Sequence, residues 1–482
     1  MPAQEVDAFT GARVLADDSP ALDLARRFRK ESHELYLVGG TVRDLALRRD
    51  FDTDLDFCTD ARPDETHAIL RPLAEAVWLQ GIEYGTVGAL VSGQRVEITT
   101  FRTERYRPGS RHPSVAFESD IKVDLSRRDF TINAMAIRLP ERDPVDPFDG
   151  VRDLKARVIR TPTEPEASFN DDPLRMLRAF RFASQLEFEI DASVLEAISR
   201  LKEKLSAISA ERIREELARL LTGSAPGRAL VLADGTGITD LFLPELGALK
   251  LEQDPVHRHK DVFAHTLAVV ERTAPELTLR LAALLHDIGK PKTRRIGPEG
   301  VSFHHHEVVG ADMARDRLRA LKFPNDVVNA VEQLIRLHHR FHTYRLGWTD
   351  SAVRRYVRDA WPLLGQLNDL VRADCTTRNQ AKAARLAERM EELEQRIQDL
   401  AAQEELDRIR PDLDGRQVMA YLGTEPGPVI GEALEMLLEA RLEEGPLGTD
   451  EAFRRLDAWA RDRGIEPIGE RVEPKPKKEE NE

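Results

Sequence analysis

The distribution of apolar residues along the chain constrains its fold more than any other feature. From about Asp171 onward nearly every segment carries apolar residues at intervals of three and four, for example residues 173–184, 211–221 and 278–289. Such spacing places one apolar stripe along an amphipathic helix. Short β-like runs, separated by Gly, Pro and charged turns, are confined to residues 35–140. We therefore predict an α+β protein in which a strand-rich N-terminal part is followed by helices.

The size and composition of the chain limit the class of protein. At 482 residues it exceeds what one hydrophobic core usually serves, so we expect about two to four folding units. Apolar residues make up 41% and charged residues 32%, which fits a well-folded soluble protein. No apolar run approaches the ~18 residues of a membrane-spanning helix. The N-terminal segment also lacks the cationic start and apolar stretch of a secretory signal, so we expect a cytoplasmic protein with no membrane partner.

The two cysteines limit the kinds of site that the chain can form, whereas the negative net charge does not exclude a nucleic-acid site. Cys58 and Cys375 are far apart and have no CxxC spacing, so disulfide frameworks and thiolate zinc sites are excluded. The net charge of −14 is unfavourable for binding phosphates, but a nucleic-acid site needs only a local excess of Lys and Arg. Local clusters are present, at Arg102, Arg105, Arg107 and Arg111, at Arg127 and Arg128, and at Arg175, Arg178 and Arg181.

Residues 36–57, YLVGGTVRDLALRRDFDTDLDF, carry the strongest chemical pattern. A strand is expected to end at Gly39–Gly40, where the missing side chains let backbone amides approach a phosphate, and a helix begins at once. Asp52, Asp54 and Asp56 then occupy alternate positions, so their carboxylates project from one face of a strand. Three carboxylates on one face repel each other unless cations lie among them. The pattern predicts a site for a phosphate and cations.

A second strand, RVEITTFR, supplies a further candidate ligand. It places Glu97 between apolar residues, where an unpaired charge would be costly to bury. Two Mg²⁺ ions held by Asp54, Asp56 and Glu97 would remove this cost, in the arrangement that serves in-line phosphoryl displacement. Magnesium fits because every candidate ligand is a hard oxygen. The alternative is a solvated edge strand that carries charge without binding metal.

The motifs GG, VRD and DLDF, taken in this order, resemble the head domain of class II nucleotidyltransferases of the DNA polymerase β superfamily. The resemblance continues through residues 124–136 (DLSRRDFTINAMA), 170–182 (NDDPLRMLRAFRF) and 208–217 (ISAERIREEL). Within that class the chain is similar to bacterial CCA-adding enzymes and their poly(A) polymerase relatives. The resemblance implies a small antiparallel sheet flanked by helices, followed by an all-helical neck.

The resemblance also implies a role for each matching residue of the head. Gly40 and Arg43 are expected to contact the triphosphate, and Asp54 and Asp56 to hold the metals. Arg128 is expected to contact the nucleotide, and Asp129 to lie close to its ribose.

In the neck, the resemblance implies that Asp172 and Arg175 act as an amino-acid template for the Watson–Crick edge of the incoming base, assisted by Arg178 and Arg181. An Asp and an Arg three apart on a helix are adjacent and offer both an acceptor and a donor. Asp172 precedes Pro173, however, and this order is also typical of a helix N-cap. Steps of three residues rotate by about 60°, so Arg181 should point about half a turn away from Asp172 and could form an ordinary ion pair instead. Family members often have Glu where this chain has Asp171.

Histidines form a second chemical centre. Ten of the thirteen fall between His257 and His342. The order of His, His-Asp, His, His and Asp resembles the HD phosphohydrolase superfamily, which implies a divalent metal other than that of the head, bound by His265, His286, Asp287, His306, His338 and Asp374. The alternative is an HD-like helical bundle kept for packing or as an RNA platform without turnover.

The resemblance predicts a CCA-adding tRNA nucleotidyltransferase that takes CTP and ATP, uses Mg²⁺ and needs no nucleic-acid template. One alternative is a poly(A) polymerase or an enzyme that adds only CC or only A. Another is an HD phosphohydrolase whose head serves only to bind RNA. The expected organisation is an N-terminal extension (1–30), a nucleotidyltransferase head (31–155), a helical neck for base recognition and RNA binding (156–250), an HD domain (251–378), a helical C-terminal region (379–470) and a disordered tail (471–482).

Overall fold

The computed structural model describes residues 13–49, 54–105, 114–251, 261–297, 300–346, 348–375, 380–404, 406 and 409–474. Contacts divide the chain into unit 1, which comprises Met1–Leu251, Ala274–Arg280 and Arg317–Pro324, and unit 2, which comprises Glu252–Thr273, Leu281–Asp316 and Asn325–Glu482. The finer boundaries expected from the sequence stay predictions. Among the residues singled out from the sequence, Asp52, Arg107, Arg111, His257 and positions 475–482 of the tail lie outside the described residues.

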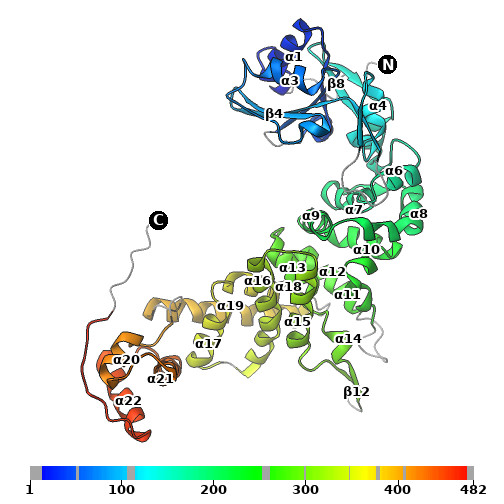
Figure 1. Cartoon of the computed structure of the whole chain (residues 1–482). Helices are drawn as coiled ribbons and strands as arrows, with labels where there is room; N and C mark the ends of the chain where they lie inside the picture. The colour runs from blue at the N-terminus through cyan, green and yellow to red at the C-terminus, as the bar shows by residue number, and fades with distance from the viewer. Residues whose placement is uncertain are drawn as a thin grey trace. The chain divides into compact units, whose positions relative to one another are not determined.

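The N-terminal part of unit 1 is built on one seven-stranded sheet (Figure 1). Its strands lie in the order β3-β4-β5-β2-β1-β8-β9, and neighbours are antiparallel except β2 and β5, which pair in parallel. The α+β prediction is confirmed, with one parallel pair in a sheet expected to be antiparallel. The strands are β1 (Leu35–Val38), β2 (Leu55–Thr59), β3 (Ala76–Trp78), β4 (Thr86–Val91), β5 (Gln94–Thr100), β8 (Ala136–Leu139) and β9 (Asp143–Val145).

Short helices accompany this sheet. The first of them, α1, begins after Ser19, whose hydroxyl accepts a hydrogen bond from the amide of Leu22 at 3.3 Å, with Pro20 at the first helical position. Its apolar side, which includes Phe28, is buried, so part of the predicted N-terminal extension belongs to the core of unit 1. The others are α2 (Gly40–Ala46), α3 (Pro63–Leu70), α4 (Ile121–Ser126) and α5 (Gly150–Ala156), with η2 (Arg13–Leu15), η3 (Ile82–Tyr84), η4 (Thr131–Asn133), and the hairpin of β6 (Arg102–Arg105) and β7 (Ser114–Phe117); α1 spans Pro20–Lys30.

One apolar cluster fixes the side of the sheet on which the site forms. Tyr36, Cys58 and Phe101 come from the sheet and the chain that leaves it, and Ile121 and Leu125 come from α4. These residues are at most 8% exposed. The cluster holds the end of α4 against β1 and β2, and the chain that follows α4 carries the RRD motif.

The helical part of unit 1 follows (Figure 1). Its central helix α7 packs against α9 and α10, and all its residues except Arg178 and Gln185 are buried, including the charged Arg175 and Arg181. The elements are β10 (Val158–Ile159), α6 (Pro165–Asp171), α7 (Arg175–Leu186), β11 (Glu189–Ile190), α8 (Ala192–Leu201), η5 (Lys202–Ala207), α9 (Ala210–Leu221), α10 (Pro226–Thr236), η6 (Thr239–Leu241) and α11 (Pro244–Ala248).

The described residues of the remaining chain are helical apart from the β12–β13 hairpin. A C-terminal group of three helices, α20, α21 and α22, encloses its own apolar core around Leu437 and Phe453. No described helix is long and apolar enough to cross a membrane. The elements are α12 (Val262–Arg272), α13 (Leu277–Leu285), α14 (Lys290–Thr293), β12 (Arg295–Gly297), β13 (Gly300–Ser302), α15 (His306–Ala320), α16 (Asn325–Leu337), η7 (His338–Leu346), α17 (Asp350–Ala360), α18 (Leu364–Asp374), α19 (Gln380–Gln403), α20 (Gly415–Leu422), α21 (Pro428–Glu444) and α22 (Thr449–Asp462).

Candidate active site

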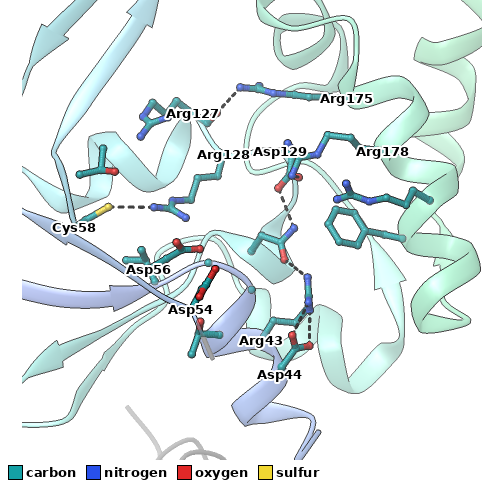
Figure 2. A pocket seen from close by; sticks show the side chains of 18 of the residues that line it. Arg43, Asp44, Asp54, Asp56, Cys58, Arg127, Arg128, Asp129, Arg175 and Arg178 are labelled. Atoms are coloured by element: carbon teal, nitrogen blue, oxygen red, sulfur yellow. Dashed lines mark hydrogen bonds and ion pairs between the residues drawn. The ribbon is translucent and has the colours of Figure 1, made fainter. Parts of the chain in front are cut away.

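A pocket of about 780 Å³ in unit 1 brings most of the predicted head and neck residues together (Figure 2). Its walls come from the Gly39–Gly40 turn, β2, the RRD motif after α4, and the first three turns of α7. Of the residues predicted from the sequence, the lining includes Gly40, Arg43, Asp54, Asp56, Arg128, Asp129, Asp172, Arg175, Arg178 and Arg181. Glu97 is not one of the lining residues.

The glycine turn allows a close approach of backbone and side chains. Gly39 has a φ of 73°, a left-handed conformation that favours glycine, and it precedes α2. A Cβ atom on Gly39 would lie 3.2 Å from Nη1 of Arg128 and 3.8 Å from Oδ2 of Asp56. The turn therefore lies directly beside the carboxylates, as the sequence pattern predicts.

Asp54 and Asp56 are both exposed towards the pocket, while Leu55 between them is buried (Figure 2). Asp54 directly precedes β2, and Asp56 pairs in register with Glu97 of β5. The pKa of Asp56 is raised, first because its surroundings displace water and also because Glu97 and Asp54 carry like charge, with Arg128 opposing the shift.

The expected burial of Glu97 is wrong. Its side chain is 44% exposed, and Arg95 lies 3.7 Å from Glu97 and 3.8 Å from Asp54. Alternation explains the difference: Val96 and Ile98 point into the core, so Glu97 projects from the opposite face, next to Asp56. The carboxylates offer only hard oxygen donors, and their mutual repulsion would be relieved by a cation, so the residues present fit a divalent metal.

Arg128 is fixed by a carboxylate that the sequence reasoning did not single out. Asp124 is fully buried and accepts hydrogen bonds from Nε and Nη2 of Arg127 at 3.0 and 2.6 Å and from Nη2 of Arg128 at 3.2 Å. Arg128 also donates to the sulfur of Cys58 at 3.2 Å. Burial opposes the ionisation of Asp124, but the two guanidinium groups lower its pKa overall. Asp124 therefore anchors both arginines at the pocket wall.

Asp129 and Arg43 are connected through one amide (Figure 2). Asn133 accepts a hydrogen bond from Nη1 of Arg43 at 2.9 Å and donates to Oδ1 of Asp129 at 3.0 Å. The other oxygen of Asp129 lies 2.7 Å from Nη2 of Arg178. Asp44 pairs with the remaining edge of the Arg43 guanidinium at 2.7 and 2.9 Å. An unbroken series of contacts thus runs from α2 to α7.

Asp172 is not the N-cap of α7, the position that Leu174 occupies; it is the C-cap residue of α6 and lines the pocket. Its Oδ1 accepts a hydrogen bond from the amide of Leu174 at 3.1 Å, just before α7 begins at Arg175. Its Oδ2 lies 3.2 Å from Nη2 of Arg212. Arg175 donates to Oγ of Ser168 at 2.8 Å and to the carbonyl oxygen of Arg127. Both side chains are thereby held in place at the pocket wall.

Arg181 forms an ion pair, which was the alternative to a nucleotide role. Its Nη1 lies 3.0 Å from Oε2 of Glu216 on α9, and both side chains are less than 10% exposed. The ring of Phe182 lies under three guanidinium groups, at 4.2 Å from Arg181, 5.4 Å from Arg43 and 5.9 Å from Arg178. Phe182 also lines the pocket, together with Gln185 and Arg219, none of which was predicted.

The predicted histidine cluster forms in unit 2 as two groups of three ligands. His265, His286 and Asp374 make one group, and Asp287, His306 and His338 make the other, with the ligand atoms of each group within 4.8 Å of one another. Asp287 faces both groups, since its Oδ2 lies 3.3 Å from Nε2 of His286 and its Oδ1 lies 3.6 Å from Nε2 of His306. All six predicted ligands are therefore brought together.

Backbone carbonyls orient three of these histidines. Nδ1 of His286, His306 and His338 lies 2.7, 2.9 and 2.6 Å from the carbonyl oxygen three residues earlier, which directs each Nε2 into the cluster. Nε2 of His286 and Oδ1 of Asp287 are buried without a hydrogen-bond partner among the described residues. Such orphaned atoms fit a metal ion, because a buried polar group without a partner is costly.

The electrostatics of the cluster are uneven. Burial opposes a charge on His286, but Asp287 and Asp374 raise its pKa to about 10. Burial lowers the pKa of His338 to about 3, and the neighbouring charge of His286 adds to this effect. Lys290 lies 2.6 Å from Oδ2 of Asp287 and balances its charge.

Family comparisons agree with this geometry. Residues 35–160 match the "Poly A polymerase head domain", residues 187–249 match the "Probable RNA and SrmB- binding site of polymerase A", and residues 262–405 match the "HD domain". The chain is 35% identical over 441 residues to an A-adding tRNA nucleotidyltransferase of Deinococcus radiodurans, covering 88% of this chain and 95% of the relative.

The chain belongs to the tRNA nucleotidyltransferase family. It is 35% identical to a CC-adding tRNA nucleotidyltransferase of Thermus thermophilus, covering 87% of this chain and 92% of that enzyme. It is 44% identical to a CCA-adding enzyme of Bacillus licheniformis over 45% of this chain and 54% of the relative. The crystal structure of the Bacillus stearothermophilus CCA-adding enzyme in complex with CTP matches with a TM-score of 0.67 and 25% identity, covering 92% of this chain and 98% of that one.

Family membership confirms that the protein is a nucleotidyltransferase with an HD domain, as the motifs predicted. Enzymes of this family generally use divalent metal ions, for which the carboxylates of the pocket are suited.

Proposed function

We propose that this tRNA nucleotidyltransferase adds C, C and A in turn to the 3′ end of tRNA in the cytoplasm, taking CTP and ATP and releasing pyrophosphate. The observation that carries the proposal is the single pocket in which Asp54 and Asp56 lie beside the Gly39–Gly40 turn and face the arginines of α7. It thus offers, in one space, groups for a triphosphate, for cations and for a base. The similarity to CCA-adding enzymes, one of them solved with CTP, supports the choice of substrates.

Asp54, Asp56 and Glu97 would hold Mg²⁺. The ions would activate the 3′-hydroxyl of the RNA and stabilise the triphosphate and the leaving pyrophosphate. Asp54 and Asp56 contribute exposed carboxylates at the pocket floor, and Glu97 contributes negative charge from the adjacent strand. Arg95 balances part of this charge while no cation is bound.

The other head residues would bind and orient the nucleotide. The amide of Gly40 and the guanidinium of Arg43 lie at the glycine turn, where the triphosphate would bind. Arg128, anchored by Asp124 beside the same turn, would contact the nucleotide. Asp129 keeps an ionised carboxylate near the ribose, because the favourable effects of Arg178 and Asn133 outweigh the opposing effect of burial on its pKa.

Base selection would need no nucleic-acid template. Asp172 offers an acceptor, and Arg175 and Arg178 offer donors, all three held by protein contacts before a base binds. Rigidly placed donors and acceptors discriminate bases because a mismatched base leaves a buried polar group unpaired. Arg181 assists by closing the pocket wall with Phe182 rather than by reading the base.

The test uses three tRNA acceptors, ending before the CCA, after the first C, and after the second C, each incubated with CTP, ATP or both. Mass spectrometry should show two C and one A added to the first acceptor, with no further growth. Two outcomes would replace the proposal with partial addition, namely A added only to the acceptor that ends in CC, or C without A. Long A tracts would identify a poly(A) polymerase.

We further propose that the six-ligand cluster of the HD domain binds divalent metal and supports phosphohydrolase chemistry on RNA ends. The specific observation is the orientation of His286, His306 and His338 by backbone carbonyls, with Asp287 between the two ligand groups. A bundle retained only for packing would gain nothing from the buried Nε2 of His286, which has no hydrogen-bond partner among the described residues.

The second proposal is tested by metal analysis and activity together. Wild-type protein dialysed against Zn²⁺, Ni²⁺ or Mn²⁺ should retain one or two equivalents of metal, whereas His286→Ala with Asp287→Ala should retain none in the HD domain. The double variant should also lose hydrolysis of 2′,3′-cyclic and terminal phosphates while adding CCA normally. Loss of nucleotide addition by this variant in a folded state would instead favour a phosphohydrolase whose head only binds RNA.

A further inference from the structure

Asn133 lies between the two ends of the pocket and bonds to both. It ends η4, is 6% exposed and belongs to the pocket wall. On one side its oxygen accepts from Arg43, and on the other its NH₂ group donates to Asp129. A residue between a cation and an anion needs an acceptor on one side and a donor on the other, and a neutral amide supplies both. These two partners also settle the orientation of the amide.

The contacts of its two partners extend the connection in both directions. Arg43 has its remaining guanidinium edge paired with Asp44, next to the glycine turn. Asp129 accepts from the amide of Phe130 and from Asn133 through Oδ1, so Oδ2 is left for Arg178 of α7, at 2.7 Å. The series thus consists of hydrogen bonds from Asp44 to Asp129 and of an ion pair from Asp129 to Arg178.

A single aromatic ring supports the same connection. Phe182 of α7 lies 5.4 Å from the guanidinium carbon of Arg43 and 5.9 Å from that of Arg178, so the arginine beside the triphosphate and the arginine beside the base pack on one ring. The head and α7 are therefore joined twice at this point, once by the ion pair of Arg178 with Asp129, which Asn133 holds, and once by packing on Phe182. Arg43 and Arg178 thus share one packing surface.

We propose that Asn133 is a positioning residue for base selection: it couples the triphosphate-binding arginine to the base-facing arginine and so sets nucleotide specificity without touching a base. The inference rests on the proposed nucleotide addition. In its absence Asp129 loses one of two donors at Oδ1, so its carboxylate is held less firmly and the position of Arg178 is less constrained. Discrimination between CTP and UTP, which depends on the placement of donors and acceptors, then falls.

Two substitutions separate the two halves of the connection. Asn133→Ala removes both hydrogen bonds. Asn133→Asp keeps an acceptor for Arg43 but faces Asp129 with a second carboxylate in place of a donor, so only the base-facing half is broken. Asn368 provides the matched control, because it is also a buried amide, 7% exposed, that accepts from the hydroxyl of Tyr356 at 2.9 Å in unit 2.

The experiment measures kcat and KM for single additions of CTP, UTP, ATP and GTP to a tRNA that lacks CCA, for all variants and the wild type. Both Asn133 variants should lower the ratio of kcat/KM for CTP over UTP about tenfold, the effect of one lost hydrogen bond to a charged group. Asn368→Ala should leave the ratio unchanged. An unchanged ratio in folded Asn133→Asp would overturn the inference, as would a fall in kcat equal for all four nucleotides. Failure of the wild type itself to add nucleotides would refute the proposed function instead.

Discussion

Replacing Asp124 with Asn should weaken nucleotide binding and also lower the stability of the N-terminal part of unit 1. The substitution keeps the size of the side chain but removes the charge that two arginines share. Asp124 is 0% exposed, and Arg127 and Arg128 are 18% and 17% exposed, so the change breaks a buried charge cluster. Breaking a buried pair by removing one partner costs about 3–5 kcal/mol. We expect the lower end, about 3 kcal/mol of unfolding free energy, because the arginines retain some contact with water.

The pH dependence of this effect has a definite sign. Burial tends to raise the pKa of Asp124, but Arg127 and Arg128 lower it below its ordinary value of 3.8 overall. A lowered pKa in the folded state stabilises the protein above the unfolded value, and the stabilisation is lost as the pH falls through the folded value. The difference between wild type and Asp124→Asn should therefore be full at neutral pH and shrink in acid, below 3.8.

The assay compares urea unfolding with the kinetics of CTP addition. Asp124→Asn should raise KM for CTP by about 10- to 100-fold, equivalent to about 1.5–3 kcal/mol for one displaced charged contact. The matched control is Asp153→Asn, since Asp153 is 2% exposed and pairs with Arg160 and Thr131 but is not among the residues that line the pocket. It should lower stability and leave KM unchanged. Equal KM values in the two variants would refute a positioning role for Asp124.

Three further outcomes are expected. Glu216→Leu alone should lower the free energy of unfolding by about 3 kcal/mol, because it leaves the charge of Arg181, less than 10% exposed, without its partner. Glu216→Leu with Arg181→Met removes both charges and should cost about 1 kcal/mol or less. Equal costs in urea unfolding would contradict this. Glu404→Gln should destabilise unit 2 by about 3 kcal/mol, since Glu404 is 3% exposed and bridges Arg354 and Arg441. The control Glu444→Gln, at an exposed pair with Arg455, should change thermal unfolding little. Similar shifts of the unfolding temperature in the two variants would contradict this. Burial and the charge of Asp124 raise the pKa of Cys58 to about 12. Iodoacetamide at pH 8 should therefore leave Cys58 unmodified in the folded protein and modify it in urea. Rapid labelling of Cys58 in the folded protein, detected by mass spectrometry, would contradict this.

Local patterns in the sequence predicted the parts of the site that depend on local geometry. The glycine turn and the alternation of Asp54 and Asp56 predict neighbouring groups on one face, and the structure has them there. The same rule of alternation, applied to β5, would have placed Glu97 on the exposed face. The apolar neighbours of Glu97 in the sequence point away from it, because successive side chains of a strand face opposite sides.

Contacts between distant elements were not predictable from such patterns. β2 and β5 pair in parallel although two strands lie between them in the chain, and periodicity carries no information on strand partners. Asp124, Asn133 and Phe182 all lie inside motifs that were recognised, yet their partners depend on how α4, η4 and α7 pack. The order of histidines predicted one cluster, but its division around Asp287 follows from helix packing.

The proposed nucleotide addition depends most on the pair of carboxylates beside the glycine turn. The most direct measurement is the incorporation of labelled CTP into tRNA lacking CCA by Asp54→Ala with Asp56→Ala, in Mg²⁺, beside wild type and the HD variant His286→Ala. The account predicts incorporation by wild type and by the HD variant, and none by the head variant, with circular dichroism spectra and tRNA binding preserved in all three. Persistent incorporation by the head variant would contradict it.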